Sequence, residues 1–167
     1  RRGAKEMTNA GDGSLELQGG ASVDRAAALS ARVLELHEDR CNCAQSLACA
    51  FSDIAQVDAD TLFVLMEGFG AGMGGHAETC GAVTAGVAVI GALASDGRAS
   101  RTTKEATYEM ASEFVEAFRG ECGSTTCHVL KEISPVPTPH RCDAYMTCAV
   151  RHLLRVLEER GLTDAGR

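Results

Sequence analysis

Residues 80–95, CGAVTAGVAVIGALAS, decide the fold of this chain. They are apolar or small almost without interruption, and glycine recurs at Gly81, Gly86 and Gly91. A helix that is apolar on nearly every side is a buried one. Its glycines let neighbouring backbones come close, at a propensity cost of roughly 1 kcal/mol each. The stretch is shorter than the ~20 apolar residues that a membrane-spanning helix needs. We therefore predict a central core helix that begins near Ala77 or Glu78 and ends at Ser95.

Apolar residues with helical spacing flank this core helix on both sides in the sequence, and capping residues mark the ends of the flanking helices. We predict helices from Ser22 to the polar run 38–40, from Asn42 to Phe51, from Asp58 onward, from Thr102 to Gly120, from Ser124 or Thr125 onward, and from Thr138–Pro139 to near Gly161. No stretch alternates in the manner of a strand. We expect an all-α fold, a compact bundle of about six to seven helices around the Gly/Ala-rich one. The helical domain covers residues 22–161, between a flexible N-terminal tail (1–21) and a C-terminal tail (162–167).

Composition and charge narrow the class of protein. Hydrophobic residues make up 45% of the 167, but aromatics only 4% and Trp is absent, so the core must be built from small aliphatic side chains. The net charge is −7 with no cluster of Lys and Arg, which argues against a nucleic-acid partner. No charged-then-apolar leader precedes the first predicted helix, so we expect a cytoplasmic protein that does not span a membrane. Under reducing conditions, cysteines are more often catalytic or metal-binding than structural.

The cysteines are the chemically informative residues, and the eight are Cys41, Cys43, Cys49, Cys80, Cys122, Cys127, Cys142 and Cys148. They form no C-x-x-C pair, which excludes the thioredoxin motif and the usual zinc ribbon. Four of them fall in the first turn of a predicted helix, where free N–H groups and the helix dipole stabilise a thiolate and lower its pKa. We predict these four as catalytic residues or metal ligands: Cys43, Cys80, Cys127 and Cys142. Cys49 and Cys148 lie well inside helices and are predicted to be small buried hydrophobes. Cys41 and Cys122 precede helices and could be exposed resolving thiols.

Several short segments resemble one protein family in order and spacing. They are NCAQ at 42–45, GAGMG at 70–74, ETCGAVT at 78–84, Gly123-Ser124 ahead of Cys127, and Cys142 at the start of the last predicted helix. The chain resembles, over roughly residues 23–158, the C_GCAxxG_C_C family of redox-active proteins with four characteristic cysteines. The resemblance implies that the four cysteines predicted above are those of the family. A similar domain occurs in split-Soret cytochromes, where it is associated with an iron–sulfur centre, and this suggests a cluster here. The chain departs from the motif at Ala85, where the family has glycine.

Two other motif matches are weaker. The segment 70–75 fits G-x-G-x-x-G with Asp96 about 20 residues on, but a predicted helix rather than a strand precedes it, which argues against a dinucleotide site. We instead predict that Gly72, Gly74 and Gly81 let the backbone come close to the sulfur of Cys80 and to any cofactor there. The segment 122–128 is a stretched haem-attachment motif, and covalent haem normally requires export. His128 and His140 lie near cysteines in the sequence and are interpreted as solvated residues.

Three functions remain open on the sequence alone. In the leading one, the four cysteines converge and bind an iron–sulfur cluster or another soft metal, and the protein passes electrons to a redox partner protein. The second is a thiol–disulfide oxidoreductase without metal. The third is a helical adaptor held together by structural zinc. The low aromatic content is compatible with a homodimer. Each metal site requires sulfurs far apart in the sequence to gather at neighbouring helix starts.

Overall fold

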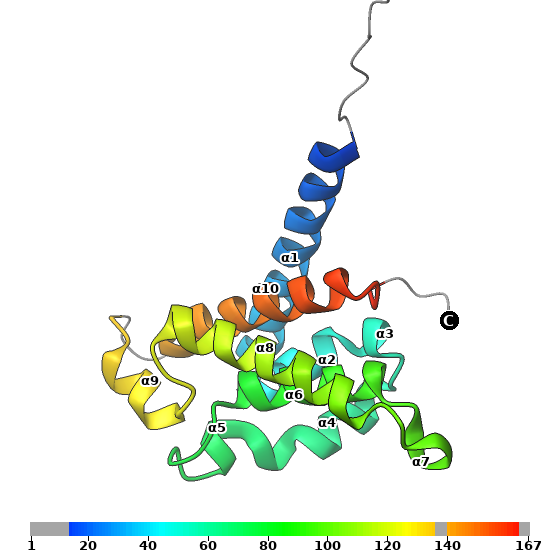
Figure 1. Cartoon of the computed structure of the whole chain (residues 1–167). Helices are drawn as coiled ribbons and strands as arrows, with labels where there is room; N and C mark the ends of the chain where they lie inside the picture. Colours follow the sequence, from blue (N-terminus) through cyan, green and yellow to red (C-terminus); the bar gives the residue numbers. More distant parts are fainter. Residues whose placement is uncertain (1–13, 136–139, 164–167) are drawn as a thin grey trace, which may run out of the picture.

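The computed structural model describes residues 14–135 and 140–163, and no strand occurs among them (Figure 1). The predicted all-α class is confirmed. The helices are α1 (Ser14–Glu38), α2 (Cys43–Ala50), α3 (Ser52–Ala55), α4 (Ala59–Met66), η1 (Glu67–Phe69), α5 (Gly70–Met73), α6 (Gly81–Ala94), α7 (Gly97–Ser100), α8 (Lys104–Cys122), α9 (Cys127–Ile133), η2 (His140–Cys142) and α10 (Asp143–Glu159).

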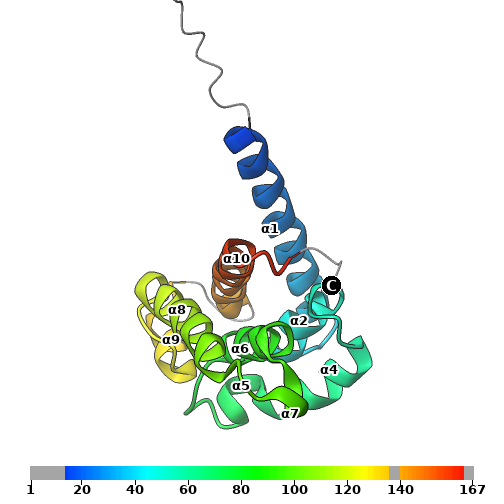
Figure 2. The ribbon, with the colours of Figure 1, turned by 45° about the vertical axis from the view of Figure 1, so that its right-hand side comes forward.

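Helix α6 is the predicted core helix, and it lies in the middle of the bundle between α2, α8 and α10 (Figure 2). Its side chains Val83, Val89 and Ile90 are fully or almost fully buried. A Cβ added at Gly86 would lie 2.4 Å from the ring of Phe114 on α8. The glycine therefore allows α8 to pack directly on the α6 backbone, as the sequence predicted for its small residues.

Several predicted helix ends differ from the structure. Helix α1 begins at Ser14, so residues 14–21 are helical rather than part of a tail, and the hydroxyl of Ser22 donates to Glu158 on α10, 2.6 Å away, instead of capping α1. Helix α8 continues past Gly120 to Cys122, where Gly123 adopts a left-handed φ of 83°. The predicted cap Thr138–Pro139, like the tail residues 1–13 and 164–167, lies outside the described residues.

Helix α6 begins at Gly81, a few residues later than predicted. Residues 76–80 instead pair through their backbone with residues 125–128. This pairing uses the N–H of Cys80 and the carbonyls of His76 and Glu78. A longer helix would need such carbonyls as acceptors for its own N–H groups, so the helix starts after the pairing. The consequence is that Cys80 becomes the N-cap residue of α6.

In Figure 1, the amino-terminal part of α1 extends away from the rest of the molecule, and its carboxyl-terminal part packs against α2 and α10. Within the described residues, no helix combines the length and the apolar character that crossing a membrane would require.

Candidate functional site

Four helix starts meet at one cavity. Cys43 is the first residue of α2, Cys80 the N-cap of α6, Cys127 the first residue of α9, and Cys142 the residue directly before α10. All four line a cavity of about 250 Å³, which we name the cysteine cavity. Its other lining residues are His37, Asn42, Ala71, Lys131 and Arg141. The four cysteines that the sequence singled out are thus brought together, although they come from four separate elements.

A short antiparallel pairing joins two of the cysteines through the backbone. The N–H of Cys80 donates to the carbonyl of Thr125, and the N–H of Cys127 donates to the carbonyl of Glu78, each at 2.8 Å. We name this pairing the backbone clasp. Because the cysteines' own N–H groups make these bonds, the clasp fixes the spacing between the starts of α6 and α9 independently of any side chain.

Asn42 fixes the start of α2 in a capping box. Its Oδ1 accepts from the N–H groups of Ala44 and Gln45, each at 2.9 Å, and the Gln45 side chain accepts from the N–H of Asn42 at 3.0 Å. The Nδ2 of Asn42 also donates to the carbonyl of Glu67 at 2.9 Å. One side chain therefore holds Cys43 at the helix start and attaches that start to the first residue of η1, which follows α4.

Two of the three predicted glycines sit where a side chain would collide with a cavity cysteine. A Cβ at Gly81 would lie 2.4 Å from the Sγ of Cys43, and one at Gly72 would lie 2.5 Å from the Cβ of Cys127. Gly74 has φ +85° and open space around it, so it serves the turn alone. These close approaches are to Cys43 and Cys127, whereas the sequence predicted an approach to Cys80.

The glycine-rich loop 70–76, which includes the short and distorted α5, is strained. Ala71, Met73 and His76 have φ of 51°, 59° and 61°, in the left-handed region that side chains with a Cβ rarely adopt. The loop is held by bonds from the N–H of Gly74 to Gly70 at 2.9 Å and from the N–H of His76 to Ala71 at 2.7 Å. Such strain costs of order 1–3 kcal/mol per residue and collects at functional sites. Here the strained residue Ala71 itself lines the cysteine cavity.

Two positively charged side chains line the cavity. Lys131 and Arg141 both border it, and the Nε of Arg141 is buried without a hydrogen-bond partner among the described residues. The Nζ of Lys131 lies 3.0 Å from Nδ1 of His76, which in turn lies 3.7 Å from the Sγ of Cys127. A buried N–H that finds no protein acceptor is costly, so its position in the lining of this cavity fits an anionic occupant.

Burial is the main influence on the pKa of three thiols in the cavity, Cys80, Cys127 and Cys142. Removal from water raises the pKa of Cys80 to about 12, and the negative charge of Cys43 acts in the same direction, while the N–H of Ala82 at the start of α6 acts against them. Burial also raises the pKa of Cys127 and of Cys142. The lowered pKa expected from the helix starts is therefore wrong for these three thiols, because desolvation outweighs the helix N–H groups.

The histidines near the cavity are not the ones that the sequence suggested. His128 and His140 are exposed, and His140 pairs with Asp143 at 2.9 Å, which agrees with a solvated interpretation. His37 and His76 border the cavity or its cysteines instead. The only signal for His76 was its place at the end of the glycine-rich loop.

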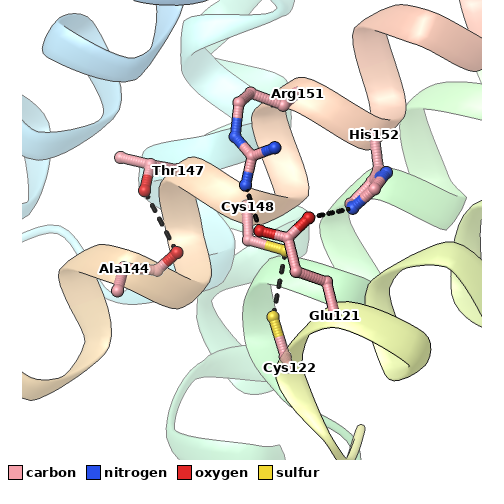
Figure 3. Close-up of polar contacts among 7 residues, drawn as sticks. All are labelled: Glu121, Cys122, Ala144, Thr147, Cys148, Arg151 and His152. Atoms are coloured by element: carbon pink, nitrogen blue, oxygen red, sulfur yellow. Dashed lines mark hydrogen bonds and ion pairs between the residues drawn. The ribbon is translucent and has the colours of Figure 1, made fainter. Parts of the chain in front are cut away.

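A second sulfur group lies between α8 and α10, and Figure 3 shows it. The Sγ atoms of Cys122 and Cys148 are 2.9 Å apart. Beside them, ligand atoms of Glu121, Cys148 and His152 lie within 4.8 Å of one another. Cys148 is buried as predicted, but it is not a mere hydrophobe because it has a thiol partner. The spacing of Cys148, Arg151 and His152 along one helix face is a weak sequence signal for this group, and the partner helix is visible only in the structure.

The fold and the cysteine cavity define an all-α protein in which cysteines from four helix starts meet at one place. Compared with known families, residues 41–156 match the one described as "Putative redox-active protein (C_GCAxxG_C_C)". This span is more than half of the chain, and the protein belongs to that family. The matched span contains all four cavity cysteines together with Cys122 and Cys148. Searches of curated proteins and of solved structures gave no match.

Proposed function

We propose that the protein is an electron carrier in which Cys43, Cys80, Cys127 and Cys142 bind an iron–sulfur cluster. The observation that carries this proposal is the common cavity that these four cysteines line, each from the start of a different helix. The family's redox activity supports the same chemistry. When bound, such a cluster supplies a one-electron couple whose potential depends on charge and hydrogen bonds around its sulfurs.

The donor set fits a cluster in charge as well as in ligand type. Four thiolate ligands favour an iron–sulfur cluster or a zinc ion. With four cysteine ligands, either complex carries a net negative charge. Lys131 and Arg141 would offset that charge, and the unpartnered Nε of Arg141 would donate to a sulfur. Hydrogen bonds to the sulfurs raise the reduction potential, because they stabilise the more negative reduced state.

The size of the cavity favours a polynuclear centre over one zinc ion. Zinc–sulfur bonds of about 2.3 Å place the four sulfurs of a structural site within ~4 Å of one another. Among the described residues, the group whose ligand atoms lie within 4.8 Å of one another is Glu121, Cys148 and His152, and no three of the cavity cysteines form such a group. Sulfurs that surround a space of about 250 Å³ leave room for several metal and sulfide atoms.

The protein's own residues have two further tasks in this function. The clasp and the capping box of Asn42 hold the sulfurs in place, which limits the rearrangement that accompanies electron transfer. The buried position of Cys80 and Cys127 keeps water away from the centre. Electrons would reach a redox partner protein across the face that carries the cavity mouth, and a reducing cytoplasm is the compartment that suits such a site.

The proposal is tested by purifying the full chain without oxygen and measuring its visible spectrum, iron and acid-labile sulfide. We expect broad absorbance with stoichiometric iron, and loss of both in Cys80→Ser and in Cys127→Ser. The matched control is Cys49→Ser, because Cys49 is half-buried and does not line the cavity. A colourless, iron-free protein with titratable dithiols would refute the cluster in favour of thiol–disulfide chemistry, and stoichiometric zinc would refute it in favour of a structural site.

A further inference from the structure

We propose that Cys122 and Cys148 form a second redox site, a dithiol that exchanges with a low-molecular-weight disulfide and becomes a disulfide itself. Neither residue lines the cysteine cavity, and the group lies between α8 and α10 (Figure 3). This site therefore goes beyond the electron-carrier function and does not depend on it.

The geometry already brings the two sulfurs into contact. They are 2.9 Å apart, and a disulfide requires about 2.05 Å, so closure needs a movement of less than about 1 Å. Cys122 is the last residue of α8 and is followed by Gly123 in a left-handed conformation, where the chain leaves the helix. A helix end can make such an adjustment more easily than Cys148, which is buried in the middle of α10.

The two thiols differ in a way that assigns their roles. Cys122 is half-buried and Cys148 is only 2% exposed, so a small disulfide can reach Cys122 first. The two thiols are in hydrogen-bond contact, and this contact lowers the pKa of Cys122 and raises that of Cys148. The charge of Arg151 also lowers the pKa of Cys122, against the effects of burial and of Glu121. Cys122 is therefore the attacking thiol and Cys148 the resolving one.

The ion pair beside the two thiols disfavours a metal ion at this site. Glu121 forms an ion pair with Arg151, and its other carboxylate oxygen lies 2.8 Å from Nε2 of His152. A metal ion bound by Glu121 and Cys148 would lie beside the guanidinium of Arg151, which repels it. The same guanidinium lowers the pKa of Cys122, against a larger opposite effect of Glu121.

The exchange balances in two steps. The Cys122 thiolate attacks one sulfur of the small disulfide, forms a mixed disulfide, and releases one small thiolate. Cys148 then attacks the Cys122 sulfur, the protein disulfide forms, and the second small thiolate leaves with the proton that Cys148 loses. In sum, the protein dithiol is oxidised by two electrons and one small disulfide is reduced to two thiols.

Closure of this bond affects the segment that carries part of the cysteine cavity. The loop between Cys122 and Cys148 contains both Cys127 and Cys142. A disulfide at its ends restricts the unfolded chain and so stabilises the folded one. The oxidised form would thus hold two of the four cavity cysteines in a covalently closed loop.

The test incubates the full chain with oxidised glutathione, alkylates the remaining thiols and maps the cysteines by peptide mass spectrometry. We expect a peptide pair joined through Cys122 and Cys148, with two hydrogen atoms lost and full reversal by a dithiol reductant. In Cys148→Ala, glutathione stays on Cys122 as a mixed disulfide. In Cys122→Ser, Cys148 remains unmodified because it is buried. Cys49→Ser is the matched control and keeps the linkage.

Three results would overturn the inference: both thiols stay free while the protein is folded and oxidant is in excess; Cys122 pairs with another cysteine; or zinc binds stoichiometrically and protects both thiols. The wild-type chain alone decides among these results, so the inference can be tested even if a variant fails to fold. Iron content is measured on the same samples. Iron without the Cys122–Cys148 linkage would support the cluster alone. The linkage without iron would support the dithiol site alone.

Discussion

At the scale of single residues, Gly81 occupies the position where the start of α6 faces Cys43. A Cβ there would lie 2.4 Å from the Cys43 sulfur and 3.0 Å from the N–H nitrogen of Ala44. The backbone nitrogen cannot move aside without shifting α2. The glycine is therefore required by the close contact of two helix starts rather than by its own backbone angles, since no left-handed φ occurs at this position.

We expect Gly81→Ala to destabilise the fold by about 1–3 kcal/mol, the usual cost of overpacking, and to reduce iron content by displacing Cys43. Gly91→Ala is the matched control, because it lies on the same helix with nothing within 4 Å of an added Cβ. The control should gain up to about 1 kcal/mol from helix propensity. Urea unfolding measures both variants. Equal stability changes at the two positions would contradict the close contact.

The cysteine pattern shows what a sequence can and cannot predict about single residues. Cys43, Cys80, Cys127 and Cys142 were predictable as a set, because capping signals are local and each cysteine stands beside one. The partnership of Cys148 was not, because its thiol partner lies on another helix. The pKa of Cys80 was predicted in the wrong direction, since burial is a property of the packed core and cannot be read from a helix start.

At the scale of elements, the start of α2 depends on Asn42. This side chain caps the helix and also donates to the carbonyl of Glu67. The two roles use different atoms of one side chain, so substitutions can separate them.

We expect Asn42→Ala to lower the free energy of unfolding by about 1–2 kcal/mol, because both the cap and the contact to Glu67 are lost. Asn42→Asp keeps an oxygen that accepts from the helix N–H groups and loses only the donor to Glu67, so its cost should be smaller. Chemical denaturation checks the order. A variant Asn42→Asp as unstable as Asn42→Ala would show that the contact to Glu67, and not the cap, is the main contribution.

The element boundaries that the sequence missed have tertiary causes. Helix α6 begins later than predicted because residues 76–80 pair with residues 125–128, which are distant in the sequence. The caps Asn42 and Asp58 were predicted correctly, because each accepts from an N–H only two or three residues away. Local hydrogen bonds are visible in a sequence, and long-range ones are not.

At the scale of the whole molecule, the proposed ligands come from four elements, so a bound cluster stabilises the folded chain and not the unfolded one. A ligand present at a thousandfold excess over its dissociation constant adds about 4 kcal/mol. For a domain of this size, that corresponds to a rise in Tm of about 8–16 °C.

We therefore expect iron removal to lower the Tm of the wild-type chain by about that amount, measured by calorimetry without oxygen. Cys80→Ser should show no difference between preparations with and without iron. An unchanged wild-type Tm after complete iron removal would contradict ligation by all four elements.

Because of the backbone clasp, the sulfur of Cys80 or Cys127 can be removed by substitution without displacing the main chain. Serine at residue 80 or 127 retains the N–H that donates to the carbonyl of Thr125 or Glu78. Replacing sulfur by oxygen there therefore leaves these main-chain hydrogen bonds in place. Variants at these two sites should consequently report on ligation itself. Among the backbone bonds of the described residues, none ties Cys43 or Cys142 to a segment distant in the sequence. A variant at either site will therefore combine loss of the ligand with displacement of the main chain.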